Sequence, residues 1–253
     1  MIITGALVVS VSVLVALAGL ILVHRLVPAT HRESYNTVAA PIIVPLSTLL
    51  GVLLAFAVFI VWQEFNTAQV TSEEEASKLA AIYWHAEELP ESERQQMQEL
   101  ARSYAQVVIE EEWPLMEQGQ ESSPAWAIVD ELRRSVDRFE PSTSAEETLH
   151  AREVTLVDDM MNDRRLRLLQ SREGIPTIMW ITLLGGSVPL IGFVFLLGLN
   201  NVRAHLLPLA MVTALIVIGL FTIKSLEYPF SGDTKVKPSA FELVQNRFEA
   251  DSQ

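Results

Sequence analysis

Carboxylates are the side chains with the most evident chemical potential in this sequence, and they come in short runs. Two runs hold three consecutive glutamates each: Glu73, Glu74 and Glu75, and Glu110, Glu111 and Glu112. Repeated around a symmetry axis, the first run would attract cations. Each run also fits a helix face that is exposed to water. His85 and Glu88 stand three residues apart, but two ligands do not complete a metal site, so we expect none.

Catalytic machinery is not recognisable in the sequence. The chain has no cysteine, which excludes a thiol nucleophile, a thiolate metal site and a disulfide. It also lacks an HExxH motif, a glycine-rich phosphate loop and a nucleophile elbow. A net charge of -13 argues against a nucleic-acid partner, whose phosphates require clustered basic side chains. We therefore expect a protein that is not an enzyme and that binds no cofactor.

One apolar stretch, VPLSTLLGV at residues 44–52, carries small and polar side chains. Pro45 is tolerated if it lies in the first turn of a helix, where a backbone N–H has no helical partner. Gly51 allows another backbone to approach closely. The hydroxyls of Ser47 and Thr48 can bond to carbonyls of their own helix. By pattern alone, this stretch fits a closely packed membrane helix without any further role.

Four apolar segments are long enough to cross a membrane. They cover about residues 2–23, 42–62, 178–199 and 206–223, and the first three contain no charge. A helix of about 20 apolar residues crosses the roughly 30 Å hydrocarbon layer. In the third segment, Gly185, Gly186, Gly192 and Gly198 offer surfaces for close helix contact. The sequence predicts an all-α membrane protein with four transmembrane helices in two hairpins.

A polar helical domain is predicted between the two hairpins. Residues 64–173 hold 25 acidic and 11 basic side chains, which accounts for nearly all of the net charge. Apolar residues recur at helical spacing, and the STSAEE segment supplies a capping box. The predicted divisions are a first hairpin at 1–63, an acidic helical domain at 64–175, a second hairpin at 176–225 and a tail at 226–253.

Basic residues near the membrane ends predict the orientation. Three lie beside the short loops and eight on the opposite side: Arg25, Arg32 and Arg203, against Lys78, Arg164, Arg165, Arg167, Arg172, Lys224, Lys235 and Lys237. Cytoplasmic flanks carry the excess of Lys and Arg. We therefore expect the acidic domain and both termini in the cytoplasm, with the lipid bilayer as a partner.

The second apolar segment resembles the second membrane helix of the bestrophins. The matching residues are Val44, Pro45, Leu46, Ser47, Leu50, Gly51, Trp62 and Phe65. Beyond the fourth segment, SLEYPFSGD is similar to the bestrophin calcium clasp, with Glu227, Pro229, Phe230, Gly232 and Asp233 in its place. Two carboxylates are too few for calcium, which takes six or more oxygen ligands. The other interpretation is a turn in which Pro229 ends the helix and Phe230 packs on the cytoplasmic domain.

Over nearly its full length the chain resembles a bacterial bestrophin-like family, formerly known only as a domain of unknown function. The shared features are the EAxxLxxIY segment from Glu75, the EEWPLM segment from Glu111, the RRLRLL segment from Arg164 and the LEYPFSG segment from Leu226. The resemblance implies a bacterial inner-membrane protein that forms a homo-oligomer, expected to be a pentamer.

The resemblance also implies an ion channel whose pore is lined by the second helix. The bestrophin neck positions correspond to Val44, Thr48 and Val52, with Ser47 and Gly51 beside them. The acidic vestibule would carry Glu73, Glu74 and Glu75, and it favours cations among the permeant ions. The alternative is a non-conducting membrane scaffold whose cytoplasmic domain binds a partner.

Overall fold

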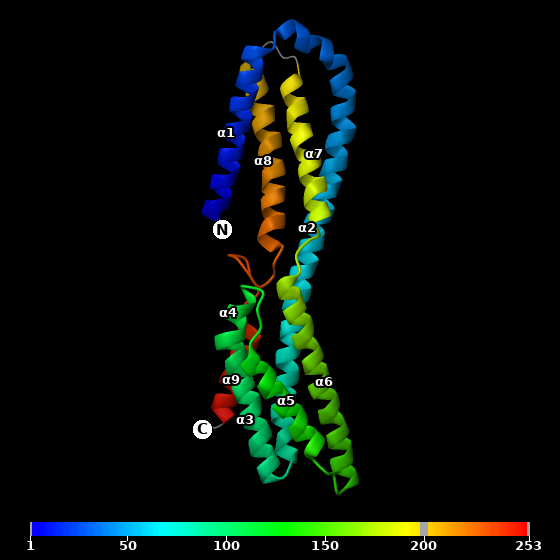
Figure 1. Cartoon of the computed structure of the whole chain (residues 1–253), viewed down its shortest axis with the longest axis vertical. Helices are drawn as coiled ribbons and strands as arrows, with labels where there is room; N and C mark the ends of the chain where they lie inside the picture. Colours follow the sequence, from blue (N-terminus) through cyan, green and yellow to red (C-terminus); the bar gives the residue numbers. More distant parts are fainter. Residues whose placement is uncertain (1, 198–201, 252–253) are drawn as a thin grey trace. The chain divides into compact units, whose positions relative to one another are not determined.

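The structure, a computed structural model, describes residues 2–197 and 202–251, and these residues form helices without any strand. In chain order the helices are α1 (Ile2–Leu26), α2 (Ala29–His85), η1 (Ala86–Glu88), α3 (Glu91–Val107), η2 (Val108–Glu112), α4 (Trp113–Met116), α5 (Ser123–Arg138), α6 (Ser144–Arg172), α7 (Thr177–Leu196), α8 (Val202–Leu226) and α9 (Ser239–Asp251). Figure 1 shows this order along the chain. The predicted all-α class is confirmed.

The helices form two compact units. The membrane unit consists of Met1–Gln63 and Ile175–Glu227, and the polar unit consists of Glu64–Gly174 and Tyr228–Gln253. Four of the described helices are long and apolar enough to cross a membrane, as predicted. α7 ends at Leu196. The predicted end of the third span, Leu199, lies outside the described residues, as does Gly198.

α2 is much longer than the span predicted from apolar sequence. The predicted spans end at residue 23 and begin again at residue 42, but α1 continues to Leu26 and α2 begins at Ala29. Residues 29–40 contain neither glycine nor proline, so nothing in them stops a helix. Pro45 therefore lies well inside α2 rather than in its first turn, as does Pro41. Each proline removes one backbone N–H from the helix ladder.

Apolar side chains and glycines pack the membrane unit. Leu50 of α2, Leu190 of α7 and Ile216 of α8 form one buried cluster. α1 lies along α8, and a Cβ added at Gly5 would meet the ring of Phe221 at 2.8 Å. Close backbone approach at such glycines is how membrane helices pack without a hydrophobic driving force.

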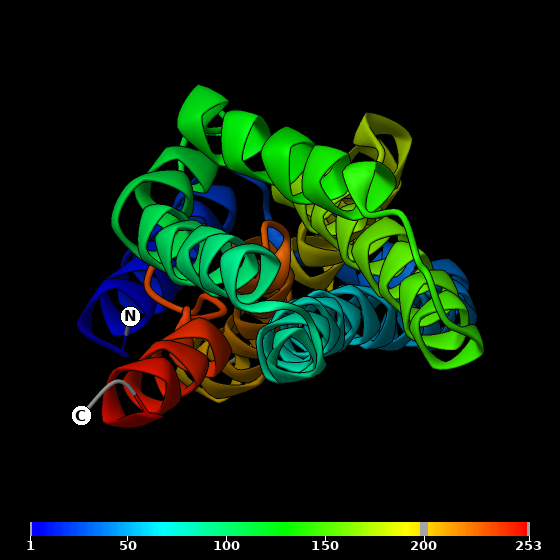
Figure 2. The same cartoon turned by 90° about the horizontal axis from the view of Figure 1, so that it is seen from below.

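The polar unit is a helical bundle with its own apolar core. Figure 2, which looks at the chain from below, shows α3 beside α5 and α5 beside α6, in agreement with their contacts. The predicted capping box starts α6: the Thr143 hydroxyl accepts from the backbone N–H of Glu146, and the Glu146 carboxylate accepts from that of Thr143. Such a box satisfies two orphan donors at a helix start.

Candidate functional site

The predicted pore-lining residues share one exposed face of α2. Val44 is 65% exposed and Val52 46% exposed, and Ser47, Thr48 and Gly51 are also exposed. A spacing of four residues keeps Val44, Thr48 and Val52 on one side of a helix. The other side of α2 is covered within the same unit, where Leu50 is 3% exposed. Ala57 and Val61 are each 1% exposed.

Both hydroxyls of this face bond to their own helix, as predicted. Ser47 Oγ donates to the carbonyl of Ile43 at 2.7 Å, and Thr48 Oγ1 donates to that of Val44 at 2.9 Å. These bonds remove the cost of placing a hydroxyl donor in an apolar setting. The lone pairs of the two hydroxyl oxygens stay accessible on this exposed face. Its side chains are smaller and more polar than large apolar side chains would be. Apart from the adjacent residues and backbone of α2 itself, no atom of the described residues lies within 4 Å of a Cβ built on Gly51.

The acidic run after the apolar part of α2 splits into two kinds of residue. Glu73 and Glu74 are exposed, and Glu73 accepts a hydrogen bond from Gln69 at 3.0 Å. Glu75 has no exposed surface, so its assignment to an exposed acidic vestibule was wrong. Glu75 lies one residue further around α2 than the exposed Glu74, and this position turns its carboxylate inward, toward Arg167.

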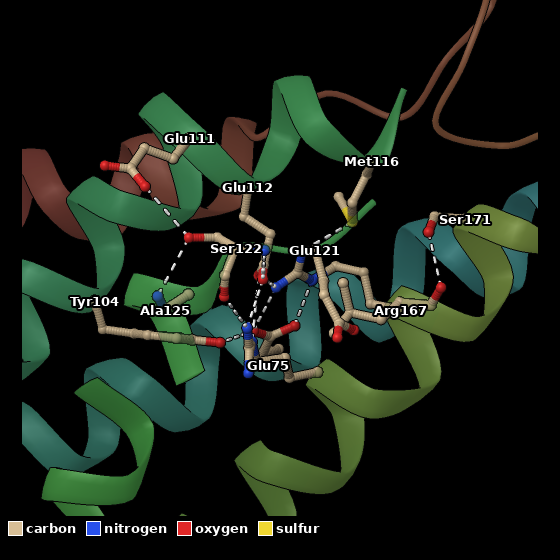
Figure 3. Close-up of polar contacts among 12 residues, drawn as sticks. Glu75, Tyr104, Glu111, Glu112, Met116, Glu121, Ser122, Ala125, Arg167 and Ser171 are labelled. Carbon is tan, nitrogen blue, oxygen red and sulfur yellow. Dashed lines mark hydrogen bonds and ion pairs between the residues drawn. The ribbon is translucent and has the colours of Figure 1, made fainter. Parts of the chain in front are cut away.

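Glu75 belongs to a buried cluster of charges in the polar unit, shown in Figure 3. Arg167 of α6 donates from Nε to Glu75 Oε2 at 2.6 Å and from Nη2 to Glu75 Oε1 at 2.9 Å. The Tyr104 hydroxyl donates to the same Oε1 at 2.5 Å. Three elements distant in the sequence are thus joined at one carboxylate.

Glu112 links the second arginine to this cluster. Arg167 Nη2 donates to Glu112 Oε2 at 2.8 Å, and Arg164 Nη2 donates to Glu112 Oε1 at 2.5 Å. The sequence indicated a solvated face for the run that ends at Glu112, yet this side chain has no exposed surface. The π-helix Val108–Glu112 (η2) shifts the helical register just before it. Two arginines and two glutamates balance each other in charge.

Aromatic rings cover the two arginines. The guanidinium carbon of Arg164 lies 4.1 Å from the ring centroid of Trp126, and that of Arg167 lies 5.1 Å from that of Trp113. Trp113 is itself 3% exposed, and its Nε1 donates to the carbonyl of Val236 at 3.1 Å. Cation–π contacts and burial from water strengthen this ion cluster.

The surroundings shift the pKa values of the cluster. Burial alone would raise the pKa of Glu112, but the charges and hydrogen bonds of Arg167 and Arg164 more than offset it, so the pKa lies below its ordinary value. Burial and the charge of Glu75 raise the pKa of Tyr104 well above its ordinary value. Glu112 therefore stays ionised and Tyr104 stays a hydrogen-bond donor at neutral pH. The cluster ties α2, α3, η2 and α6 together and contains no group poised for proton transfer.

The clasp-like sequence after α8 divides between the two units. In the membrane unit, Glu227 accepts from Trp180 Nε1 at 2.9 Å and from Lys224 Nζ at 2.7 Å. Both partners are donors, so this carboxylate is already used.

In the polar unit, the remaining clasp-like residues form a turn. The backbone N–H of Val236 donates to the carbonyl of Pro229 at 2.8 Å, and Gly232 has a φ of 80°. Phe230 is fully buried with its ring edge-on to Trp113, 5.6 Å between centroids, while Asp233 is exposed. The geometry matches the turn interpretation, in which Phe230 anchors the chain after α8.

Sequence reasoning missed the two buried arginines. Arg164 and Arg167 were counted as basic flanks of the membrane, whereas both are fully buried. Their neighbours Leu166 and Leu169 are 42% and 46% exposed. In this part of α6, charged side chains are therefore buried and apolar side chains are exposed. The available signal was the spacing of three residues, which places both arginines on one helix face.

Comparisons with known proteins agree with this architecture. A crystal structure of a mutant bacterial bestrophin homologue from Klebsiella pneumoniae superposes with a TM-score of 0.73 at 10% identity, covering 96% of this chain and 98% of that one. A second structure of that homologue, solved by zinc phasing, gives 0.70 at 10% identity over 94% and 96%. A third, another mutant, gives 0.69 at 11% identity over 99% of each chain. These likenesses show a shared fold.

The family follows from the sequence match. No curated protein matches the chain. The model of the Bestrophin-like domain matches residues 10–241, which is most of the chain. The shared fold and the family match together support a channel-type membrane protein. The chain belongs to the bestrophin-like family.

Proposed function

We propose that copies of this chain assemble into a ring, expected to be a pentamer, and that α2 lines an ion pathway along the ring axis. The observation that carries the proposal is the exposed face of α2, on which Val44, Thr48 and Val52 recur every four residues while the opposite face is buried. A single chain with uncharged spans encloses no water path, so conduction requires assembly. Val44, Thr48 and Val52 would form the constriction, with Ser47 and Gly51 beside them.

Exposed leucines outside the membrane unit also support assembly. Leu166 and Leu169 lie on the outer face of α6, beside the exposed Arg165 and opposite the buried charge cluster. Leu243 of α9 is 65% exposed. Apolar side chains left uncovered on an acidic domain fit contacts between subunits.

The permeant ion is proposed to be a cation. Glu73 and Glu74 remain exposed after Glu75 is assigned to the buried cluster, and each would repeat once per subunit around the axis. Rings of acidic side chains raise the local concentration of cations at a pore entrance. With the buried Arg164 and Arg167 set aside, six basic flanking residues against three still support an orientation in which the polar unit and both termini lie in the cytoplasm of a bacterial inner membrane. In this role the protein catalyses no reaction.

Ion flux into liposomes tests the pore face with a matched pair of variants. Thr48→Phe would narrow the constriction with a bulky ring and is expected to reduce flux at least tenfold. Thr182→Phe is the control, because Thr182 of α7 is also exposed and donates to its own helix, to the carbonyl of Ile178 at 2.9 Å. Equal flux through wild type and Thr48→Phe would overturn the assignment of this face.

The number of subunits tests the ring itself. Native mass spectrometry of the protein in nanodiscs is expected to give a closed oligomer of four or more chains, with five favoured. A monomer or dimer would remove the axis that α2 is proposed to line. Leu166→Glu combined with Leu169→Glu is expected to lower the subunit count while the secondary structure of the chain remains, because both side chains are exposed in the single chain.

A further inference from the structure

A partly buried histidine and a buried carboxylate form a pair at the end of α2, away from the charge cluster described above. His85, the last residue of α2, has its Nδ1 atom 2.8 Å from Oε1 of Glu153 on α6. Glu88 stands three residues from His85 in the sequence, but the structure pairs His85 with Glu153. Glu153 is 2% exposed, and its second oxygen, Oε2, is buried without a hydrogen-bond partner among the described residues. An unsatisfied buried carboxylate oxygen is costly when the group is charged.

Glu153 forms part of the wall of a small cavity between α3, α5 and α6. The cavity has a volume of about 30 Å³, and its apolar lining includes Leu89, Met97 and Phe139. A space of this size holds about one water molecule. Gln96 also lines the cavity and is exposed, so the rim reaches the surface. A proton can therefore exchange between solvent and this carboxyl group.

The charged and titratable groups around the pair come from three elements. Arg152 on α6 and Glu88 on η1 act on both residues, and Glu93 of α3 and His150 of α6 line the same cavity. Burial raises the pKa of Glu153 to about 7, with Arg152 opposing the shift and Glu88 adding to it. Burial also lowers the pKa of His85, and Arg152 adds to that shift while Glu88 opposes it. Burial disfavours the charged form of each partner.

The directions of these shifts define which forms the pair adopts. Below about pH 7 the carboxyl of Glu153 is protonated, and its O–H donates to the neutral imidazole of His85. Above this pH the proton leaves, and the Nδ1–H of His85 donates to a carboxylate whose other oxygen stays unsatisfied. The pair changes from neutral to negatively charged by the loss of one proton.

We propose that His85 and Glu153 form a proton-binding site whose deprotonation loosens the contact between the end of α2 and α6. The geometry makes the site a clamp, because Glu153 is the side chain that holds the last residue of α2 to another helix. A group whose pKa is raised in the folded chain stabilises the fold at pH values below its pKa in the unfolded chain. This stability is lost as the pH rises through its pKa in the folded chain. The site thus stabilises the contact most in mild acid and less above about pH 7.

The lowered pKa of His85 opposes the effect of Glu153 on the stability of this contact. Its contribution has the opposite sign, because stability is lost when the pH falls through the pKa of His85 in the folded chain and the partly buried imidazole gains a charge. In mild acid the loss from His85 therefore offsets part of the stability that Glu153 adds. The clamp does not depend on conduction, since both residues belong to the polar unit. It does concern α2, the helix that also carries the exposed face at residues 44–52.

Hydrogen exchange of the full chain in nanodiscs, corrected for the intrinsic pH dependence, tests the clamp. Protection of peptides that cover residues 80–90 and 148–158 is expected to fall a few-fold between pH 6 and pH 8. Deprotonation of Glu153 alone would give about tenfold, reached mainly below pH 7, and the titration of His85 opposes it. In Glu153→Gln this protection should not fall between pH 6 and pH 8, because only His85 of the pair remains to titrate. Glu147→Gln on the same helix is the control, because Glu147 is exposed, and it should behave as wild type.

An infrared titration of the wild-type chain labelled at its glutamate carboxyls tests the proton directly and requires no variant. A protonated glutamate carbonyl band is expected at pH 6 and should disappear with a midpoint of about 7. The band should be missing from Glu153→Gln if that variant folds. Absence of the band in wild type at pH 6, or protection that is independent of pH, would overturn the proposal.

Discussion

Arg167 and Glu75, 92 residues apart in the chain, are joined by two hydrogen bonds inside the polar unit, of 2.6 and 2.9 Å. Both side chains have no exposed surface. Buried paired charges stabilise a fold only while each keeps its partners, because a buried charge that loses its partner keeps its full desolvation cost. The pair fixes which face of α2 turns toward α6.

Removal of Arg167 should damage the polar unit severely. Arg167→Met leaves the carboxylates of Glu75 and Glu112 buried with fewer donors, and breaking a buried pair in this way costs about 3–5 kcal/mol. For a chain of this size, the melting temperature should fall on the order of 10 °C. Thermal unfolding of the full chain in detergent, followed by tryptophan fluorescence, measures the change, since Trp113 lies against this arginine.

Arg133→Met is the control for that experiment. Arg133 is 56% exposed on α5, with its Nε atom 3.9 Å from Asp137, and an exposed pair of this kind is worth about 0–1 kcal/mol. Its melting temperature should lie close to that of wild type. Similar falls in melting temperature for the two variants would show that the burial of Arg167 does not make its ion pairs more important for stability than an exposed pair.

Acid should weaken the cluster through Glu112. Its pKa is lowered in the folded chain because Arg167 and Arg164 outweigh the effect of burial. A lowered carboxyl pKa gives stability that is present above the unfolded value, near 4.5, and that is lost as the pH falls through the folded value. Between pH 5 and pH 3 the melting temperature of wild type should fall more steeply than that of Glu112→Gln. The control Glu110→Gln, at an exposed position, should follow wild type, and parallel curves for Glu112→Gln would contradict the assignment.

Adjacent glycines of α7 should differ in their tolerance of a side chain. A Cβ at Gly186 would lie 3.1 Å from Cδ1 of Leu50. A Cβ at Gly185 would have no described atom within 4 Å apart from adjacent residues and backbone of α7 itself. Gly186→Val should lower the stability of the membrane unit by about 1–3 kcal/mol through overpacking. Gly185→Val should cost less, as measured by thermal unfolding of the two variants in the same detergent. The reverse order would contradict the packing of α7 on α2.

The sequence predicts the fold better than the buried charges. Uncharged apolar segments specify the membrane helices, and Thr143 with Glu146 marks the start of α6, because both signals depend on residues close in the chain. Burial of Glu75 and Glu112 depends on Arg164 and Arg167, which lie 52 to 92 residues away. A run of glutamates has the same local pattern on a solvated face. The partner of His85 was missed for the same reason, since Glu153 lies 68 residues further along.

Exposed carboxylates should set the ion preference if the ring conducts. Glu73→Gln combined with Glu74→Gln removes two negative charges per subunit while the side-chain size is kept, and the permeability ratio of cations to anions should fall several-fold. Reversal potentials across a planar bilayer with a salt gradient measure that ratio. Glu147→Gln, an exposed charge on α6, should leave it unchanged. A ratio unaffected by the double substitution would assign selectivity to other residues.

Chemical modification of a single cysteine tests the central proposal, that the exposed face of α2 lines the ion path. The chain has no cysteine, so Thr48→Cys and Thr182→Cys each introduce one thiol without background. A charged, membrane-impermeant thiol reagent should block ion flux through Thr48→Cys and leave flux through Thr182→Cys intact. Flux through Thr48→Cys that persists after complete modification, or a thiol that the aqueous reagent never reaches, would contradict the account.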